Sequence, residues 1–249
     1  MAFSAERLQS VLGKRRFKFY EAVGSTNDVA LAWLTEGAPA GSVVVADEQT
    51  RGRGRLGRTW FAPPGTALMF TYLLRPSVES VTYVGMMGAL AVCEVVESYG
   101  VRSCGIKWPN DVQIEGRKLC GILPEAAWQS DELIGVALGI GLNASVDFLQ
   151  TPFSDTAISL EAVTGQVDRA DVLMRLLERL DYWSARMDSQ ALFEGWRDRL
   201  VMLGRHVSIH NAAGEAEGIA ESVDRQGALL VREANGALTR VVAGDIALG

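Results

Sequence analysis

The chain has little lysine, histidine or cysteine, and each shortage argues against a kind of chemistry. Four of its 24 basic residues are lysines, and only two of its 249 residues are histidines. His206 and His210 fall in one predicted strand without a nearby cysteine, which argues against a metal site there. The three cysteines form no C-x-x-C pair, so we expect free thiols in a reducing cytoplasm.

Two further absences concern partners. No signal peptide is recognisable, and the apolar run VGMMGALAVCEVV is interrupted by Glu94, so it predicts a buried helix and no membrane span. The net charge of −6, without a helix-turn-helix segment before residue 25, argues against DNA and anionic membranes as partners. Phosphate binding would therefore need a local basic cluster, and the densest is Arg51, Arg53, Arg55 and Arg58.

Hydrophobic periodicity predicts an α/β (α+β) fold, with a mixed β-sheet flanked by helices. We expect helices over 4–12, 24–34, 78–100, 155–165, 169–187 and 191–201, with Ser4 and Ser25 as the first two caps. Strands are expected over 15–23, 42–49, 66–74, 105–108, 111–116, 118–127 and 132–143, with a hairpin turn at Glu115-Gly116.

The tail differs in character from the rest of the chain. Short strands over 206–210, 215–223, 228–233 and 238–244 are separated by Gly and Asn turns. This pattern predicts a small five-stranded, SH3-like β-barrel. We therefore expect a catalytic domain over 1–202 and a small β domain over 203–249.

The stretch GRGRLG (52–57) fits the dinucleotide-binding pattern G-x-G-x-x-G but not its context. That fingerprint needs a helix directly after the glycines, and Pro63, Pro64 and Gly65 stand where the helix should run. A Walker A loop is also excluded, because no Gly-Lys-Ser/Thr follows. What remains is a glycine-spaced loop that carries four cations.

The energetics of this loop predict that a ligand orders it. Fixing its eight residues costs roughly 8–16 kcal/mol of backbone entropy. Four charge-assisted hydrogen bonds to an anion return roughly 6–12 kcal/mol. Because these terms nearly cancel, we expect a loop that is mobile when empty and ordered by an anionic ligand. The alternative is a solvated surface loop.

Four other segments place polar side chains at the ends of predicted elements: GSTND (24–28), IKWPNDV (106–112), GRKLCGILPE (116–125) and GIGLN (139–143). Each alone has an ordinary explanation, such as a helix cap, a turn or a lysine stem packed on a sheet. Together with GRGRLGRTW, and in this order, they resemble the biotin–protein ligases. That family's pattern is a Ser-Thr-Asn segment, a Gln before GRGRxGR and Trp, then KWPND, RK-x-x-GIL and G-x-G-x-N. The motifs span residues 24–143.

The resemblance implies a two-step, ATP-dependent ligase. Biotin is activated to biotinyl-5′-AMP, and biotin then passes to a specific lysine of a biotin carboxyl carrier protein. Biotin and ATP are the implied substrates, and Mg²⁺ is the implied metal. Both steps concentrate negative charge on phosphate, which fixed cations stabilise without a protein nucleophile or a histidine base. Without a predicted DNA-binding segment, the chain resembles the family's non-repressor form.

The resemblance also implies roles for individual residues. The segment expected to meet the ureido ring of biotin is Ser25, Thr26 and Asn27, with Gln49 on the same side. The segment expected to close over biotin and its adenylate is Gly52, Arg53, Gly54 and Arg55. Arg58 is expected to face phosphate, and Asn110 and Asp111 are expected to hold phosphate and Mg²⁺. Lys118 is expected to contact the reacting carboxyl and the α-phosphate. The catalytic set is Lys118, Arg55 and Arg58, and the rest of the binding set is Trp60 over adenine, Gly121, and Asn143 at the nucleotide.

Two departures and several alternatives stay open at this point. Pro124 replaces the family's usual β-branched residue, so we expect a bulge that puts a role for Glu125 in doubt. A second asparagine after Asn143 is missing, since Ala144 and Ser145 follow. For Trp60 the alternative to a role at the adenine is a structural one, as a tryptophan of the core. The other functions are a lipoate or octanoate ligase and a non-catalytic biotin-binding module, and a homodimer stays open.

Overall fold

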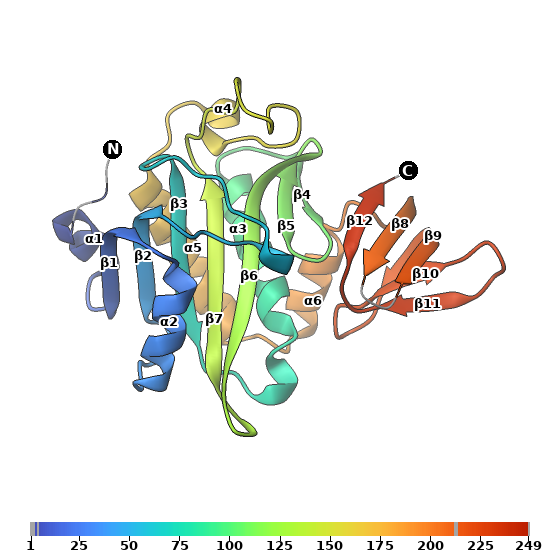
Figure 1. The fold of residues 1–249 in the computed structure, drawn as a ribbon, viewed down its shortest axis with the longest axis horizontal. Helices are drawn as coiled ribbons and strands as arrows, with labels where there is room; N and C mark the ends of the chain where they lie inside the picture. Colours follow the sequence, from blue (N-terminus) through green and yellow to red (C-terminus); the bar gives the residue numbers. More distant parts are fainter. Residues whose placement is uncertain (1–2, 4, 212–213, 249) are drawn as a thin grey trace.

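The computed structural model describes residues 3, 5–211 and 214–248, which form a seven-stranded and a five-stranded sheet (Figure 1). The predicted cap Ser4 lies outside the described residues. In chain order the first part contains α1 (Ala5–Leu12), β1 (Phe17–Val23), α2 (Thr26–Thr35), β2 (Val43–Gln49), β3 (Ala67–Leu74), α3 (Tyr83–Ser98), β4 (Cys104–Lys107), β5 (Asp111–Ile114), β6 (Arg117–Gln129), β7 (Glu132–Asn143), α4 (Leu160–Thr164), α5 (Arg169–Ser184) and α6 (Gln190–Arg197). Short 3-10 turns lie at Arg55–Gly57 (η1) and Val78–Ser80 (η2).

The large sheet is mixed, as the sequence predicted. Its strand order is β1-β2-β3-β7-β6-β5-β4. The strands β1 and β2 run parallel, and α2 forms the crossover between them. The other neighbouring pairs in this order, β2–β3, β3–β7, β7–β6, β6–β5 and β5–β4, are antiparallel.

Helices cover the two faces of this sheet unequally. On one face α3 packs on β4 to β7, α5 packs on β3, and α6 packs on α3. On the other face lies α2, which contacts β2, β3, β6 and β7 (Figure 1). All eight residues of β3 are buried, and α3 is apolar nearly all round and buried, as predicted. The segment between β2 and β3 crosses the α2 face and leaves a site between itself and the sheet.

The tail forms the second sheet, with β8 (His206–Asn211), β9 (Gly214–Val223), β10 (Leu229–Arg232), β11 (Leu238–Val241) and β12 (Asp245–Leu248). The order β11-β10-β9-β8-β12 is antiparallel throughout, which confirms the five predicted strands, although β12 was not located from the sequence. The two parts are tied together, because the indole Nε1 of Trp108 donates to the Gly227 carbonyl at 2.8 Å.

Local predictions had mixed outcomes. The hairpin turn at Glu115 and Gly116 is confirmed, with positive φ at both residues (52° and 80°). The bulge expected at Pro124 is wrong, because the β6–β7 register shifts instead between Ala127 and Trp128. The reason is the direction of the backbone. The Ile122 N–H points towards the β5 side, to the Asn110 carbonyl, so the nitrogen of Pro124 points the same way, away from β7 and beyond the end of β5.

Helix lengths also differ from the predictions. The helix expected over 155–165 occupies only Leu160–Thr164, and the one expected from residue 78 begins at Tyr83 after the turn η2. Within the described residues, no helix combines the length and the apolar character that a bilayer crossing requires.

Candidate active site

A pocket of about 370 Å³ lies on the α2 face of the large sheet, under the segment that follows β2. That volume is in the range of small-molecule sites. Thirteen of the fifteen predicted site residues line it, and Gly52 and Asn143 are the two that do not. The structure therefore brings together segments that are more than ninety positions apart in the sequence, from Ser25 to Gly121.

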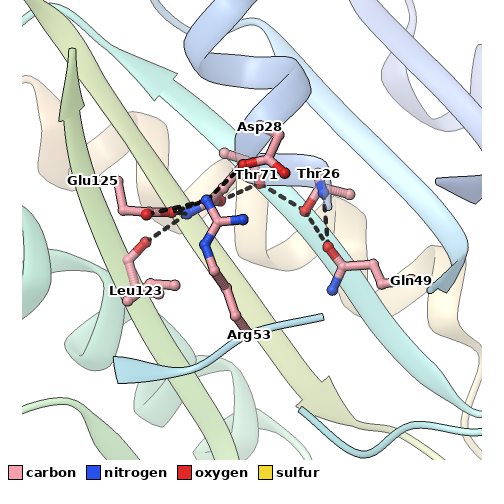
Figure 2. A network of polar contacts seen from close by, with 8 residues as sticks. Thr26, Asp28, Gln49, Arg53, Thr71, Leu123 and Glu125 are labelled. Atoms are coloured by element: carbon pink, nitrogen blue, oxygen red, sulfur yellow. Dashed lines mark hydrogen bonds and ion pairs between the residues drawn. The ribbon is translucent and has the colours of Figure 1, made fainter. Parts of the chain in front are cut away.

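One end of the pocket is a closed hydrogen-bond network at the start of α2 (Figure 2). The Thr71 hydroxyl, on buried β3, lies 2.6 Å from Asn27 Oδ1 and 2.9 Å from the Thr26 hydroxyl. The Asn27 amide nitrogen donates to the Leu123 carbonyl (3.1 Å) and to Glu125 Oε2 (2.6 Å). Because both ends of the amide have partners, Asn27 has one fixed orientation.

Gln49 replaces a serine cap at the first turn of α2. Ser25 holds the N-cap position, as predicted, but its hydroxyl makes no capping hydrogen bond. Instead Gln49 Oε1 accepts from the Thr26 backbone N–H at 2.7 Å and from the Thr26 hydroxyl at 3.0 Å. The Gln49 amide nitrogen contacts only Met69 Sδ, at 3.6 Å, among the described residues. This nitrogen and the Ser25 hydroxyl are therefore available to a polar ligand at this end.

The predicted loop reaches this network through Arg53. Its Nη2 lies 2.7 Å from Asp28 Oδ1 and 3.0 and 3.1 Å from the two Glu125 oxygens (Figure 2). The hydrogen bond to Asp28, with a further one to Glu125, raises the pKa of Arg53. All four loop arginines were expected to bind a ligand anion, but Arg53 already has two protein carboxylates. Glu125, whose role was doubted, is part of the network.

The opposite end of the pocket is built on the β4–β5 turn and the start of β6. Lys118 Nζ lies 2.7 Å from Asp111 Oδ1. The Asn110 amide is fixed to β6 through the Ile122 carbonyl (2.8 Å), and its oxygen accepts from Arg55 Nη1 at 3.0 Å. These contacts join the loop, the turn and the lysine strand into one group of charged and amide side chains.

Glycines of the GIGLN and GIL motifs make room for two site residues. A Cβ on Gly139 would lie 2.5 Å from Asn27 Oδ1, and one on Gly141 would lie 2.9 Å from the indole of Trp60. Gly121 pairs with Gly141 across β6 and β7, and its Cβ would lie 3.2 Å from the same indole. Trp60 therefore lies against two adjacent glycines. Its buried Nε1 has no hydrogen-bond partner in the described part of the chain.

Asn143 and Gly52 act behind the pocket wall. The Asn143 amide nitrogen donates to the carbonyls of Lys118 and Ile158, both at 3.2 Å, and its side chain is buried. Asn143 thus supports the backbone of the lysine. Gly52 accepts a hydrogen bond from the Trp60 backbone N–H, which closes the base of the loop.

The charges of the pocket oppose those of the whole chain. Among the described residues, the lining includes five cations, Arg53, Arg55, Arg58, Lys107 and Lys118, and one carboxylate, that of Asp111, in a protein of net charge −6. Such a cluster suits a polyanionic ligand. The Cys120 thiol beside it is fully buried, which raises its pKa, so the group stays a neutral thiol and supplies no thiolate nucleophile.

The donor set fits a magnesium ion that is held mainly by substrate phosphates. No cluster of three or more His, Cys, Asp or Glu side chains able to hold a metal occurs among the residues described. Asp111 offers one carboxylate, of which Oδ1 faces Lys118. Magnesium commonly takes one or two carboxylates and completes its shell with phosphate oxygens and water.

Several residues of the site were not predicted from the sequence. Lys107 and Trp108 lie within KWPND, in the same motif as Asn110 and Asp111, but received no role. Gly244 and Ile246 come from the C-terminal sheet, and no local pattern in the tail marks them. Thr71 and Asp28 complete the network of Figure 2, and Thr71 carried one available signal, a small hydroxyl residue in a strand of otherwise apolar and aromatic residues.

Comparison with known proteins agrees with this geometry. The sequence model of the Biotin/lipoate A/B protein ligase family matches residues 19–143, and that of the Biotin protein ligase C terminal domain matches residues 202–249. The first match covers half of the chain and contains all the predicted site residues. The chain belongs to the biotin/lipoate A/B protein ligase family.

Individual relatives extend the likeness over nearly the whole chain. A biotin–[acetyl-CoA-carboxylase] ligase of Paracoccus denitrificans is 33% identical, over 84% of this chain and 90% of that protein. One of Mycobacterium tuberculosis is 32% identical, over 94% of this chain and 89% of that protein. The structure of the biotin protein ligase from Aquifex aeolicus in complex with biotin and ATP has a TM-score of 0.81 and 28% identity, and covers 94% of this chain and 98% of that one.

Proposed function

We propose that this protein is a biotin–[biotin carboxyl carrier protein] ligase. It activates biotin with ATP and transfers it to a lysine of a carrier domain. One observation carries the proposal: a single pocket joins a closed polar network, suited to a small uncharged ring, to a group of cations suited to phosphates. The family match and the relatives of the same activity support it.

The chemistry needs charge stabilisation more than proton transfer. In the first step a biotin carboxylate oxygen bonds to the α-phosphorus of ATP, and the bond to pyrophosphate breaks. In the second step the carrier amine attacks the acyl carbon, AMP leaves, and the amine loses a proton. Negative charge gathers on phosphate oxygens in both steps, so preorganised cations lower both barriers.

We assign the two ends of the pocket to the two substrates. The ureido ring of biotin lies at Ser25, Thr26, Asn27 and Gln49, where the Gln49 amide nitrogen and the Ser25 hydroxyl offer hydrogen bonds. The catalytic residues are Lys118, Arg55 and Arg58, with Lys118 between the reacting carboxylate and the α-phosphate. Trp60, a lining residue whose indole lies against Gly121 and Gly141, covers the adenine. Gly121 lets Trp60 approach closely, Gly52 and Gly54 belong to the loop that closes over the ligand, and Asn143 supports Lys118 from behind.

Magnesium belongs beside Asp111. The carboxylate of Asp111 would hold the ion, and the Asn110 amide would orient the phosphates near it. The ion supplies charge neutralisation on ATP when it is bound. Asp111 also positions Lys118 through their 2.7 Å ion pair.

Polarity favours biotin over lipoate or octanoate. The tail of either acid is apolar at the end away from its carboxylate, and it would leave the Gln49 amide and the Ser25 hydroxyl without partners. A buried unpaired polar group costs about 1–3 kcal/mol. The match of residues 202–249 to a biotin protein ligase domain agrees with this preference.

The remaining assignments are proposals of the same kind. The catalytic domain spans 1–202 and the small β domain spans 203–249. The boundary lies between α6, which ends at Arg197, and β8, which begins at His206. The free cysteines suit the reducing cytoplasm as the location. The partner is a carrier domain of a biotin-dependent carboxylase.

Transfer to a carrier domain tests the function. Purified protein, ATP, Mg²⁺ and biotin should attach biotin to a carrier domain, as read by mass spectrometry. A carrier in which arginine replaces the acceptor lysine is the control and should stay unmodified. Pyrophosphate exchange that proceeds with lipoate or octanoate but not with biotin would contradict the proposal.

A further inference from the structure

Arg53 sits between two carboxylates that come from different elements. Asp28 projects from the first turn of α2, and Glu125 lies on β6 (Figure 2). The Arg53 Nη2 is 2.7 Å from the first and 3.0 Å from the second. Asp28 keeps 47% of its side chain exposed, and Arg53 and Glu125 keep 30% each, so these contacts are partly shielded from solvent.

Glu125 connects this contact to the biotin end of the pocket. The oxygen that accepts from Arg53 Nη2 at 3.0 Å also accepts from the Asn27 amide nitrogen at 2.6 Å. The orientation of Asn27 is thereby linked to the position of the loop. A displacement of Arg53 would leave Glu125 with the amide alone, beside an unpaired Asp28.

Local charge argues against a substrate anion at Arg53. One guanidinium and two carboxylates sum to a net charge of −1. An anionic carboxylate brought to Arg53 would meet two like charges within a few ångströms, and it would have to compete with both for the same N–H groups. At the other end of the pocket, Asp111 is the one carboxylate among the lining residues that the structure describes.

We propose that Asp28 and Glu125 are positioning residues that hold Arg53, and with it the loop 51–58, against the biotin end of the pocket. In this role Arg53 is a tether for the loop and not the cation that binds biotin's carboxylate. The inference rests on the proposed function, because it assigns the network to the biotin end. It also differs from the expectation that all four loop arginines bind a ligand anion.

A pair of ligands that differ in charge separates a tether from a ligand cation. Calorimetry without ATP would measure the affinities for biotin and for the corresponding alcohol, in which CH₂OH replaces the carboxylate. The variants are Arg53→Ala, Asp28→Asn and Glu125→Gln. Arg51→Ala is the matched control, since Arg51 is an exposed arginine of the same loop that is placed outside the pocket lining.

A tether predicts equal losses for both ligands. Each of the three variants should bind biotin and the alcohol about three- to tenfold more weakly, as expected for partly exposed charged hydrogen bonds. The ratio of the two affinities should stay that of the wild type, and Arg51→Ala should match the wild type. The double variant Arg53→Ala/Glu125→Gln should be no weaker than Arg53→Ala, because both changes break the same contact.

Selective or missing losses would overturn the inference. A loss of biotin binding in Arg53→Ala with unchanged alcohol binding makes Arg53 a ligand cation. Unchanged affinities in Asp28→Asn and Glu125→Gln, or additive losses in the double variant, remove the positioning role. A lower melting temperature with unchanged affinities makes the cluster merely structural. Wild-type protein that binds neither compound overturns the proposed function itself, and that outcome is visible before any variant is compared.

Discussion

The two ends of the pocket differ in how their charges are balanced. At the start of α2, buried hydroxyl and amide groups pair with one another, and the one cation, Arg53, lies between two carboxylates. At the start of β6, Arg55, Arg58, Lys107 and Lys118 share the lining with Asp111, the one carboxylate among the lining residues that the structure describes. The first end can select an uncharged group by hydrogen-bond geometry. The second end gathers cations that suit phosphates. This difference predicts that changes at the first end alter affinity and changes at the second alter rate.

The largest expected effect is at Lys118. Replacement by alanine removes a point charge that interacts most strongly when charge gathers on the α-phosphate, so biotinyl-AMP formation should slow by roughly 10²–10³. Lys118→Arg should not restore the rate, because a planar guanidinium cannot occupy the same point. Single-turnover adenylate formation measures both, with melting temperature as the folding control. A Lys118→Ala rate within about threefold of wild type would show that the lysine takes no part in the chemistry.

The next effect concerns biotin affinity. Thr71→Val keeps the side-chain shape but removes the hydroxyl that contacts Asn27 and Thr26, which leaves buried groups unpaired at a cost of about 1–3 kcal/mol. We expect biotin to bind roughly tenfold more weakly, by calorimetry. Thr35→Val, at an exposed hydroxyl near the end of α2, is the control. Equal biotin affinity in both variants would mean that the network does not shape the biotin end.

Salt should separate the two ends without any substitution. Raising ionic strength from about 0.05 to 0.5 M screens the partly exposed cations, so ATP should bind several-fold more weakly. Biotin binding to the paired network should change much less. Titrations at both salt concentrations, with Mg²⁺ held constant, measure the two responses. A stronger salt response for biotin than for ATP would reverse the comparison.

The smallest effect concerns the contact between the two parts of the chain. Trp108→Phe removes the Nε1 hydrogen bond to the Gly227 carbonyl and costs about 1 kcal/mol, or about 2–4 °C in melting temperature for a chain of this size. The comparison variant is Trp33→Phe, which keeps an aromatic ring beside Lys18. If both variants melt at the same temperature, the hydrogen bond between the two parts of the chain adds no stability.

The sequence was most informative where one local pattern decides the structure. The buried helix α3, the two-residue hairpin at Glu115 and Gly116, and the mixed sheet follow from periodicity and turn chemistry. The motifs also placed most of the site, because each lies at the end of a predicted element. These are features that residues near one another in the sequence determine.

What the sequence did not reveal depends on contacts between distant segments. Ser25 holds the cap position, but its expected hydrogen bond is replaced by Gln49, which is 23 residues from Thr26 in the chain. The prediction of a bulge at Pro124 was wrong because β5 pairs with β6 only as far as Gly121. The edge of β6 towards which the Pro124 nitrogen points therefore has no ladder hydrogen bond to lose. Gly244 reaches the pocket only through packing between the two sheets. The partners of Arg53 likewise lie on α2 and β6; both fall within the segments GSTND and GRKLCGILPE, but no local pattern pairs them with Arg53.

The account assigns biotin affinity to one end of the pocket and reaction rate to the other. Single-turnover biotinyl-AMP formation, measured across a range of biotin concentrations, tests this assignment most directly. Wild type, Lys118→Ala and Thr71→Val would be compared at saturating ATP and Mg²⁺. The account predicts that Lys118→Ala lowers the maximal rate by roughly 10²–10³ and changes the half-saturating biotin concentration far less. It predicts that Thr71→Val raises that concentration roughly tenfold and nearly preserves the maximal rate. A reversed pattern, or equal changes of both quantities in both variants, would contradict the assignment of the two ends.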